Sequence, residues 1–457
     1  MLNPSYFYNK LKSRLTRGHE RSLKAKQNIL ISGIVKFASM ATSLIIVPLT
    51  LSYVSNAEYG IWLTISSVFG WISLFDIGLG GGLRNRLTEA LAENDRELAK
   101  TYVSTTYAAL TLIMLGATLL FMLVNPFLNW SDVLNTSQEL SAELKIISYV
   151  VFILFAVQFV LKLINTVLTA DQQIGKASVF NFLGSFISLA AIYILIQTTT
   201  GSLTNLVLVL SISPIIVSLI TSLFYYNKNY RDISPSIKFI KFSYIKNVAN
   251  LGLQFFIIQI AATIVYSASN FLIAQFFGPE QVTPYNISYR LFNTLSVIFF
   301  IIIAPFTAAF TDAYYKKDFD WIRRIIKKLI RVWIYTSLCG IILLLISPFI
   351  FKIWIGDKVQ IPFLLSICIV IYFILLTWNA IFTSFLNGAG KIRLQLIASI
   401  GEAIIFIPLA YLFAVKLDFG ISGIVIASSI PLFIDGFWLM IQYNKLIHLT
   451  AQGIWDK

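Results

Sequence analysis

The chain has 457 residues, of which 57% are hydrophobic and 12% charged, and its formal net charge at pH 7 is +14. A soluble domain carries about 25% charged residues, so this composition excludes a soluble enzyme and indicates a protein that crosses a bilayer several times. The two cysteines, Cys339 and Cys368, lie in long apolar runs, and the two histidines lie in polar segments near the chain ends. We therefore expect free buried thiols, no metal site and no bound cofactor.

The first 27 residues form a basic, polar segment. No short apolar core with a small-residue cleavage site follows them, so we expect no cleavable signal peptide. A membrane-spanning helix needs about 20 apolar residues. The sequence predicts twelve such helices, at about 28–50, 59–80, 103–126, 146–169, 177–198, 203–226, 247–277, 284–309, 328–351, 361–385, 394–415 and 420–442. The turns between them leave no room for a soluble catalytic domain, so we expect an all-α integral membrane protein.

Lysine and arginine are distributed unevenly between the two sides of the predicted helices. If the N-terminus is cytoplasmic, 28 of the 35 lysines and arginines fall in cytoplasmic segments and four fall in external ones. Because basic residues are retained on the cytoplasmic side of membrane proteins, we expect both termini in the cytoplasm. This asymmetry also accounts for the net charge without a nucleic-acid partner.

The two halves of the chain resemble each other. EYGIWL opens the second predicted helix and PYNISY opens the eighth, and an alanine followed five residues later by an aspartate comes after each helix. VLTADQQIGK ends the fourth helix and SFLNGAGK ends the tenth. Repeats with an even number of helices share one orientation, as in many transporters. We expect a cytoplasmic segment, a six-helix bundle, a basic cytoplasmic linker, a second six-helix bundle and a tail, at 1–27, 28–226, 227–246, 247–442 and 443–457.

Two cytoplasmic loops have the pattern of helices that lie on the membrane surface. In DWIRRIIKKLIR, 320–331, the isoleucine and leucine side chains fall on one helical face and the lysines and arginines on the other. Such a helix is suited to the lipid–water interface, with its basic face on anionic headgroups. A weaker equivalent follows the second helix and consists of Leu87, Leu91, Leu98 and Tyr102. We interpret both as anchors at equivalent points of the repeat.

Charged side chains within predicted membrane helices need a reason, because each costs about 2.5–3.5 kcal/mol on insertion scales. Lys36 lies about eight residues into the first helix, and Arg290 lies one or two turns from the outer end of the eighth. Helices at these early positions line the cleft of a two-bundle transporter. Because ammonium and guanidinium groups match phosphate oxygens, we expect a cleft for an anionic substrate. Snorkelling of Arg290 to lipid headgroups is the alternative.

Acidic residues also lie within the predicted helices. Glu402 and Asp435 occupy the middle of the two last helices, with no basic residue near them in the sequence. Two such carboxyl groups are able to bind a cation or to share a proton, or they form a structural hydrogen bond between helices. Asp76 lies near the inner end of the second helix, where it either pairs with Arg84 or Arg86 or has a role in transport.

The stretches AEYGIW, DIGLGGGLRNRLTEALAENDRELAKTY and LNGAGK, with twelve predicted helices in two halves, resemble the O-antigen and polysaccharide flippases. Their superfamily also contains the multidrug and toxic compound extruders (MATE) and the peptidoglycan lipid flippases. The resemblance covers nearly the whole chain and is most specific at 76–102. It implies a V-shaped, MATE-like fold of two bundles related by a pseudo-two-fold axis, in the bacterial inner membrane.

The resemblance also implies the substrate and the mechanism. Flippases of this kind move a polyprenyl-diphosphate-linked oligosaccharide to the outer leaflet by alternating access, with the lipid tail in the bilayer and no catalytic residue. By this resemblance Lys36 and Arg290 face the sugar diphosphate in a cationic cleft. Membrane lipids are further partners, and a polysaccharide polymerase is a candidate one.

The sequence departs from the peptidoglycan flippases in two respects. Those proteins have two additional helices and a more arginine-rich first helix, so a peptidoglycan precursor is a poor expectation for the substrate. Their cation site uses an acid in the seventh helix, whereas 248–278 contains no charged residue here. Coupling to H⁺ or Na⁺ through Glu402 and Asp435 therefore stays open.

Two other classes of function are to be weighed. A MATE-type multidrug antiporter would place carboxylates in the central cleft to bind cations, whereas the predicted cleft carries Lys36 and Arg290. An O-antigen polymerase or ligase needs a large external loop with catalytic residues, and no external loop exceeds about twenty residues. A glycosyltransferase needs a nucleotide-sugar domain, and Asp318 and Asp320 lie in a short loop without one.

The stretch FDIGLGGGLRNR, 75–86, superficially matches a phosphate-binding loop. A dinucleotide-binding loop follows a β-strand within a βαβ unit, whereas a predicted membrane helix precedes this stretch. We interpret the glycines as the point where that helix gives way to a surface helix, with Arg84 and Arg86 as cytoplasmic anchors. In the alternative, the exposed amides and the two arginines, with Asp76, form an inner gate that meets the arriving diphosphate.

Overall fold

The computed structural model describes residues 20–72, 78–245 and 268–456. Every regular element within these residues is helical. The first half of the chain forms α2 (Glu20–Tyr53), α3 (Asn56–Gly70), α4 (Leu79–Ala92), α5 (Arg96–Val124), α6 (Trp130–Val133), α7 (Ser141–Leu161), α8 (Leu163–Ala170), α9 (Ile174–Thr198) and α10 (Leu203–Asn227). The second half forms the helix Ala268–Phe277, α13 (Val282–Tyr315), α14 (Phe319–Ile355), α15 (Phe363–Ala389), α16 (Arg393–Tyr411) and α17 (Ile421–Ile447).

Ten helical segments of the described chain are long and apolar enough to cross a membrane, which confirms the expected class of fold. Two shorter helices, α3 and Ala268–Phe277, stand where the second and seventh membrane helices were expected. The rest of those two expected helices lies partly in 73–77 and 246–267, outside the described residues. For the same reason the boundary between the two expected bundles stays a prediction.

Large apolar side chains cover the outer faces of these helices. Leu119, Leu123 and Leu345 are 62%, 69% and 68% exposed, far more than a water-facing helix tolerates in such numbers. These faces suit the hydrocarbon of a bilayer. The two cysteines are free, as expected. Cys368 is buried, but Cys339 is exposed on α14, because an apolar run in a membrane protein faces either the lipid or the protein interior.

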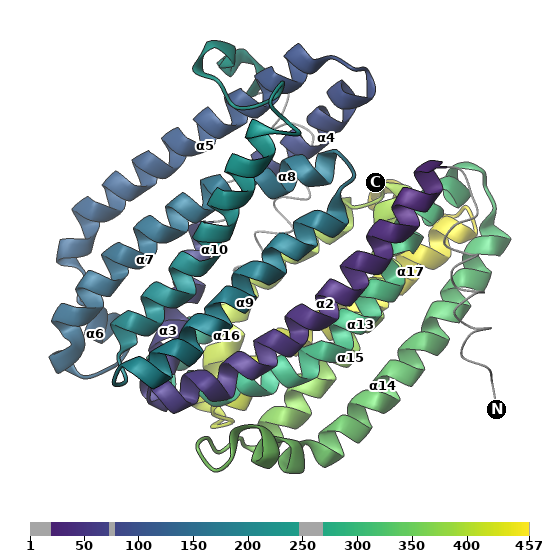
Figure 1. The fold of residues 1–457 in the computed structure, drawn as a ribbon. Coiled ribbons are helices and arrows are strands. Elements are labelled where there is room, and N and C mark those ends of the chain that lie inside the picture. The colour runs from purple at the N-terminus through teal and green to yellow at the C-terminus, as the bar shows by residue number, and fades with distance from the viewer. Residues whose placement is uncertain (1–19, 73–77, 246–267, 457) are drawn as a thin grey trace, which may run out of the picture.

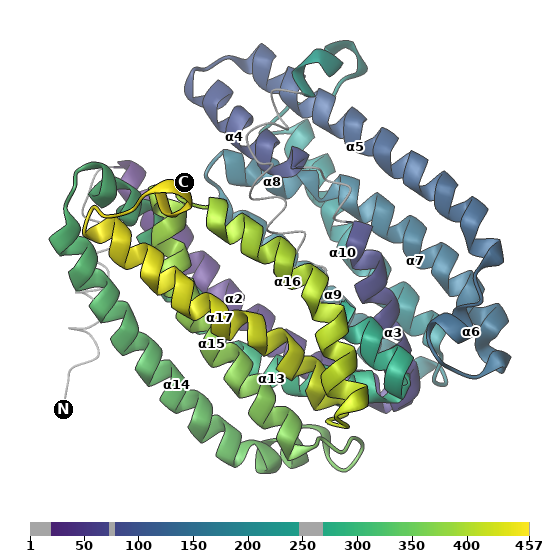
Figure 2. The ribbon, with the colours of Figure 1, turned by 180° about the vertical axis from the view of Figure 1, so that it is seen from behind.

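The helices form two groups that meet along α2 and α9 (Figure 1). Figure 2 shows the same grouping from behind, with α5, α7 and α10 on one side and α14, α15 and α17 on the other. The first long helix, α2, runs along α9 and also touches α13 and α14 of the second half. A helix from the first half therefore forms part of the boundary with the second.

Two turns recur at equivalent places in the halves. The backbone N–H of Asp95 donates to the Ala90 carbonyl (3.0 Å), and that of Asp318 donates to the Ala313 carbonyl (2.9 Å). Each aspartate then caps the following helix, α5 or α14, by accepting a backbone N–H three residues on. The turns after α8 and α15 also match, with hydrogen bonds of 2.8 and 2.9 Å that end those helices. The repeated motifs of the sequence thus encode repeated turns.

The basic amphipathic segment 320–331 is not a separate surface helix. It forms the start of α14, which continues without a break for 37 residues. Its apolar residues Ile322, Ile325, Ile326 and Leu329 are buried against α13, α15 and α17 rather than facing lipid. The expected anchor was wrong because an apolar stripe has the same spacing whether it contacts lipid or protein. The weaker equivalent also packs inward, with Leu87 and Tyr102 buried.

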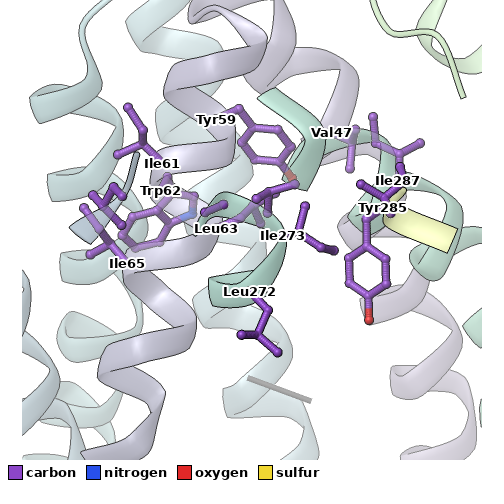
Figure 3. Packing of buried hydrophobic residues seen from close by; sticks show 14 of the residues in the cluster. Val47, Tyr59, Ile61, Trp62, Leu63, Ile65, Leu272, Ile273, Tyr285 and Ile287 are labelled. Atoms are coloured by element: carbon purple, nitrogen blue, oxygen red, sulfur yellow. The ribbon is translucent and has the colours of Figure 1, made fainter. Parts of the chain in front are cut away.

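Within the part of the chain that the structure describes, buried apolar residues form one shared core and two separate ones. At the end of the molecule where α2 ends and α3 begins, residues of both halves pack together, among them Val47, Tyr59, Ile273, Tyr285 and Ile287 (Figure 3). At the other end, α4, α5 and α8 enclose a core of the first half, and α13, α14, α15 and α17 enclose a core of the second. We call this second end the basic end, because it carries the lysines and arginines of 316–331 and 391–393.

Candidate functional site

A cavity of about 610 Å³ lies among α13, α15, α16 and α17, with Lys36 of α2 in its wall. It extends from the turn between α15 and α16, at the basic end, toward the middle of the helices. Its polar lining consists mainly of Lys36, Asn379, Asn387, Gln395, Glu402 and Asp435. A mostly apolar cavity with a few convergent polar groups is the usual form of a small-molecule or headgroup site.

The two carboxyl groups that the sequence placed in adjacent helices face each other in this cavity. Glu402 on α16 and Asp435 on α17 lie within side-chain hydrogen-bonding reach. Asp435 Oδ1 also accepts a hydrogen bond of 2.7 Å from Trp438 Nε1. A hydrogen bond between two carboxyl groups requires one proton, because an ionised carboxylate only accepts. The structure thus brings the acid pair together, as expected, and in addition places Lys36 on the same cavity.

Arg290 does not line this cavity with Lys36, although both were expected in one cleft. It lies half-buried on α13, and its Nη1 atom donates a hydrogen bond of 3.0 Å to the carbonyl oxygen of Ser43 on α2. Nearby, Trp354 Nε1 on α14 donates to the carbonyl oxygen of Leu44 (2.9 Å). Arg290 is therefore a contact between the two halves in this conformation.

Polar side chains join the two halves at the end opposite the basic end. Asn56 Nδ2 donates to the carbonyl oxygen of Lys358 (2.6 Å), and Lys358 Nζ donates to that of Leu51 (3.3 Å). Thr283 Oγ1 donates to the carbonyl oxygen of Asn56 (2.8 Å). We call this group, with Ser67, Asn270 and Asn286 described next, the polar seam.

The seam continues toward the middle of the helices. Asn270 Nδ2 donates to Ser67 Oγ on α3 (2.6 Å), and Asn286 Nδ2 donates to Asn270 Oδ1 (2.8 Å). Backbones also approach closely here, since a Cβ atom at Gly60 would overlap the carbonyl oxygen of Pro279. With the shared core, the seam holds the halves together at this end, while their cores at the basic end are separate.

The glycine-rich stretch begins a helix. Gly78 has a positive φ of 78° directly before α4, and the following glycines lie in the first turn of α4. The preceding helix, α3, ends at Gly70 rather than near residue 80. On α4, Arg86 forms a salt bridge of 2.8 Å with Glu89, and Arg84 is exposed. Asp76 lies outside the described residues, so its expected pairing with either arginine stays a prediction.

The fold and the cavity define a class of protein, the helical membrane transporters with a MATE-like fold. The chain is similar to a multidrug resistance MATE family transporter in its inward-facing conformation (TM-score 0.75, 17% identity, 93% of this chain and 100% of that one). Similarity to an outward-facing conformation of such a transporter is lower (TM-score 0.61, 18% identity, 96% and 98% covered). At these identities the likeness concerns the fold.

Residues 25–310 match the family of polysaccharide biosynthesis proteins, and the chain belongs to this family. It is 22% identical over 418 residues to a protein of Yersinia pseudotuberculosis described as an O-antigen export protein, covering 88% of this chain and 91% of the relative. A protein of Shigella flexneri described as an O-antigen transporter is 23% identical, with 85% and 90% covered. These relatives confirm the resemblance found in the sequence motifs.

Proposed function

We propose that this protein moves a polyprenyl-diphosphate-linked oligosaccharide, such as an O-antigen repeat unit, across the bacterial inner membrane by alternating access. The family and the descriptions of its relatives support the substrate class. The observation that carries the mechanism is the arrangement of the cores, which are joined at one end and separate at the other. In this proposal the basic end and both termini lie in the cytoplasm, so the structure corresponds to an inward-open state.

In this proposal Lys36 receives the diphosphate first, because it already lines a cavity at the basic end. Arg290 is engaged with the Ser43 carbonyl while the polar seam is closed. Opening of the seam breaks that contact and frees the guanidinium for the phosphate oxygens. The two cations thus act one after the other, rather than together in one resting cleft.

Glu402 and Asp435 are the candidate coupling groups. A hydrogen bond between the two carboxyl groups would need one shared proton, and Lys36 lines the same cavity. Arrival of an anionic headgroup at Lys36 changes the charge balance around that proton, which makes H⁺ the favoured coupling ion over Na⁺ in this proposal. Arg84 and Arg86 on α4 remain candidates for an inner gate, with the exposed Arg84 the better placed to meet a headgroup.

The same carboxyl pair is the observation that favours a second function, that of a MATE-type antiporter for organic cations. Acids in a cavity bind cations, so this function needs its own test. Efflux of a cationic dye by cells that overproduce the protein supports the antiporter, and surface glycan without dye efflux supports the flippase. A catalytic role has no comparable support, since the relatives are described as transport or export proteins.

The flippase proposal is tested by rescue of a strain that lacks its own flippase, against several lipid-linked glycans. Wild-type protein is expected to restore surface polysaccharide for at least one glycan, and Lys36→Ala to abolish it at normal protein level, whereas Lys36→Arg retains part of it. Lys162→Ala is the matched control, because Lys162 is an exposed lysine between α7 and α8 that does not line the cavity. Full rescue by Lys36→Ala would remove Lys36 from the mechanism.

A further inference from the structure

The segment between the two halves carries exposed positive charge. Residues 228–245 follow α10 and include two short turns of 3₁₀ helix, η4 (Ile237–Phe239) and η5 (Phe242–Tyr244). The one acid of this segment, Asp232, forms a salt bridge of 3.3 Å with Arg96 of α5. Its basic side chains are exposed and consist of Lys228, Arg231, Lys238 and Lys241. We call residues 228–245 the linker, and its charge is suited to an anionic partner.

Two large apolar side chains of the linker are also exposed. Ile237 is 88% exposed and Phe242 is 52% exposed. Each lies next to a lysine in the sequence, Lys238 or Lys241, so that apolar and basic side chains are interleaved over 237–242. Apolar side chains beside lysines are typical of segments at a lipid–water interface, where the lysines contact anionic headgroups.

Backbone hydrogen bonds hold the linker along α5. The backbone N–H of Ser236 donates to Ser104 Oγ (3.0 Å), and that of Lys241 donates to Thr105 Oγ1 (3.0 Å). Both η4 and η5 contact α5, and Figure 1 shows the linker beside the end where α5 begins. The position of Ser104 and Thr105 along α5 therefore sets the depth of the linker relative to the membrane.

The length of α5 places these contacts at the membrane surface. With 29 residues, α5 is about 44 Å long, whereas the hydrocarbon core is about 30 Å thick and takes about 20 residues. Counted back from the end of α5, such a span covers 105–124, and the large exposed apolar side chains of α5 lie within it, from Leu112 to Val124. Thr105 thus lies where the hydrocarbon ends on the basic side. Ile237 and Phe242 are held near this level, which favours contact with lipid over contact with a cytoplasmic protein.

We propose that the linker anchors the protein to the membrane surface: Ile237 and Phe242 insert between lipid chains beside α5, and Lys238 and Lys241 bind the phosphates of anionic lipids. The attraction between these lysines and the headgroups is electrostatic, so it weakens as salt screens the charges. The inference concerns the segment that joins the halves and does not depend on which substrate is transported.

The test uses the full-length protein in nanodiscs, with Cys339→Ser, Cys368→Ala and Ile237→Cys labelled with the fluorophore NBD. The nanodiscs contain phosphatidylcholine alone or an equal mixture of phosphatidylcholine and phosphatidylglycerol. A doxyl-labelled phosphatidylcholine, present at the same fraction in both, quenches a fluorophore that lies among the lipids. We expect at least about twofold stronger quenching in the anionic nanodiscs at low salt, and loss of this difference at high salt.

Lys238→Gln combined with Lys241→Gln should remove the difference between anionic and neutral nanodiscs. Lys241 contacts Thr105 through its backbone N–H, so the linker stays on α5 in this variant, and an unchanged melting temperature checks this. Lys316→Gln combined with Lys317→Gln is the matched control, because these two exposed lysines also lie at the basic end but follow α13. The control should leave the difference unchanged.

Three results would overturn the proposal. One is no quenching by the doxyl lipid in anionic nanodiscs, which shows that residue 237 does not reach the lipid. Another is equal quenching in neutral and anionic nanodiscs that Lys238→Gln with Lys241→Gln does not change, which excludes binding of anionic headgroups. The third is protection of the label from iodide only after a cytosolic extract is added, which assigns the linker surface to a protein partner.

Discussion

Pro48 explains why one carbonyl group of α2 accepts a hydrogen bond from the other half. Proline has no N–H, so the Leu44 carbonyl lacks the partner four residues on that a regular helix supplies. That carbonyl is satisfied instead by Trp354 Nε1. The neighbouring Ser43 carbonyl accepts a further hydrogen bond from Arg290. A single proline thus links the backbone of α2 to contact between the halves.

This coupling predicts a double-mutant cycle. Trp354→Phe should lower the stability of the folded protein by about 1 kcal/mol, because it leaves the Leu44 carbonyl unpaired. In a Pro48→Ala background the same change should cost much less, since the alanine supplies the missing backbone N–H. Melting temperatures of the four proteins in detergent measure this, and equal shifts in both backgrounds would contradict the role given to Pro48.

The sequence alone identified the unusual charged residues, but it did not predict which of them lie close together. Lys36, Arg290, Glu402 and Asp435 stand out because charge is costly in a membrane helix. The proximity of the two acids followed from adjacent helices. The separation of Arg290 from Lys36, and the presence of Lys36 on the cavity of the acids, depend on how α2 crosses the second half, which no local pattern encodes. Asn379, Asn387 and Gln395, which also line the cavity, were missed because Asn and Gln carry no charge and mark no spacing.

Among the helices, α3 and α14 show what sequence patterns predict and where they fail. Both helices begin earlier than the expected 59 and 328, at capping residues: Ser55 and Glu58 form a capping box at α3, and Asp318 caps α14. The end of α3 was harder to predict, because the apolar run in the sequence continues past Gly70. The start of α14 was expected to be a separate helix on the membrane surface. With 37 residues at about 1.5 Å each, α14 is about 55 Å long and therefore longer than the bilayer is thick. For this reason the sequence pattern did not show that the two parts form one continuous helix.

The close approach of α3 to the turn Pro279–Gln281 leads to a prediction for Gly60. Gly60→Val should force α3 away from Pro279, because a side chain there overlaps the Pro279 carbonyl oxygen. We expect this variant to fold and to transport at least tenfold less than wild type. A cysteine added at the seam end should react faster with water-soluble thiol reagents in this variant. Gly116→Val is the control, since no atom lies within 4 Å of its added Cβ. Normal transport by Gly60→Val would show that this contact is not needed for closure.

The two halves of the molecule are held together at one end by the shared core and the polar seam, so the proposed transport cycle requires that end to open. Ser67 and Asn270 are suited to test this, because their side-chain atoms Oγ and Nδ2 are 2.6 Å apart across the two halves. Cysteines at these two positions therefore lie within reach of a short bifunctional thiol cross-linker.

In a background of Cys339→Ser and Cys368→Ala, the pair Ser67→Cys and Asn270→Cys should be joined by a short, reducible bis-methanethiosulfonate cross-linker. Cross-linking is expected to stop transport of lipid-linked glycan while binding of the lipid from the basic end persists, and reduction should restore transport. The single-cysteine proteins serve as controls. Undiminished transport by fully cross-linked protein would contradict opening at the seam.

The division of the buried residues into three cores also bears on the order in which the protein is assembled. The core of α4, α5 and α8 uses only residues of the first half, so it can form while the second half is still being synthesised. The core of α13, α14, α15 and α17 is likewise local to the second half. The shared core, however, is complete only after Ile273, Tyr285 and Ile287 have been synthesised and packed with Val47 and Tyr59. The contacts that separate in the proposed transport cycle are thus the last to form during biogenesis.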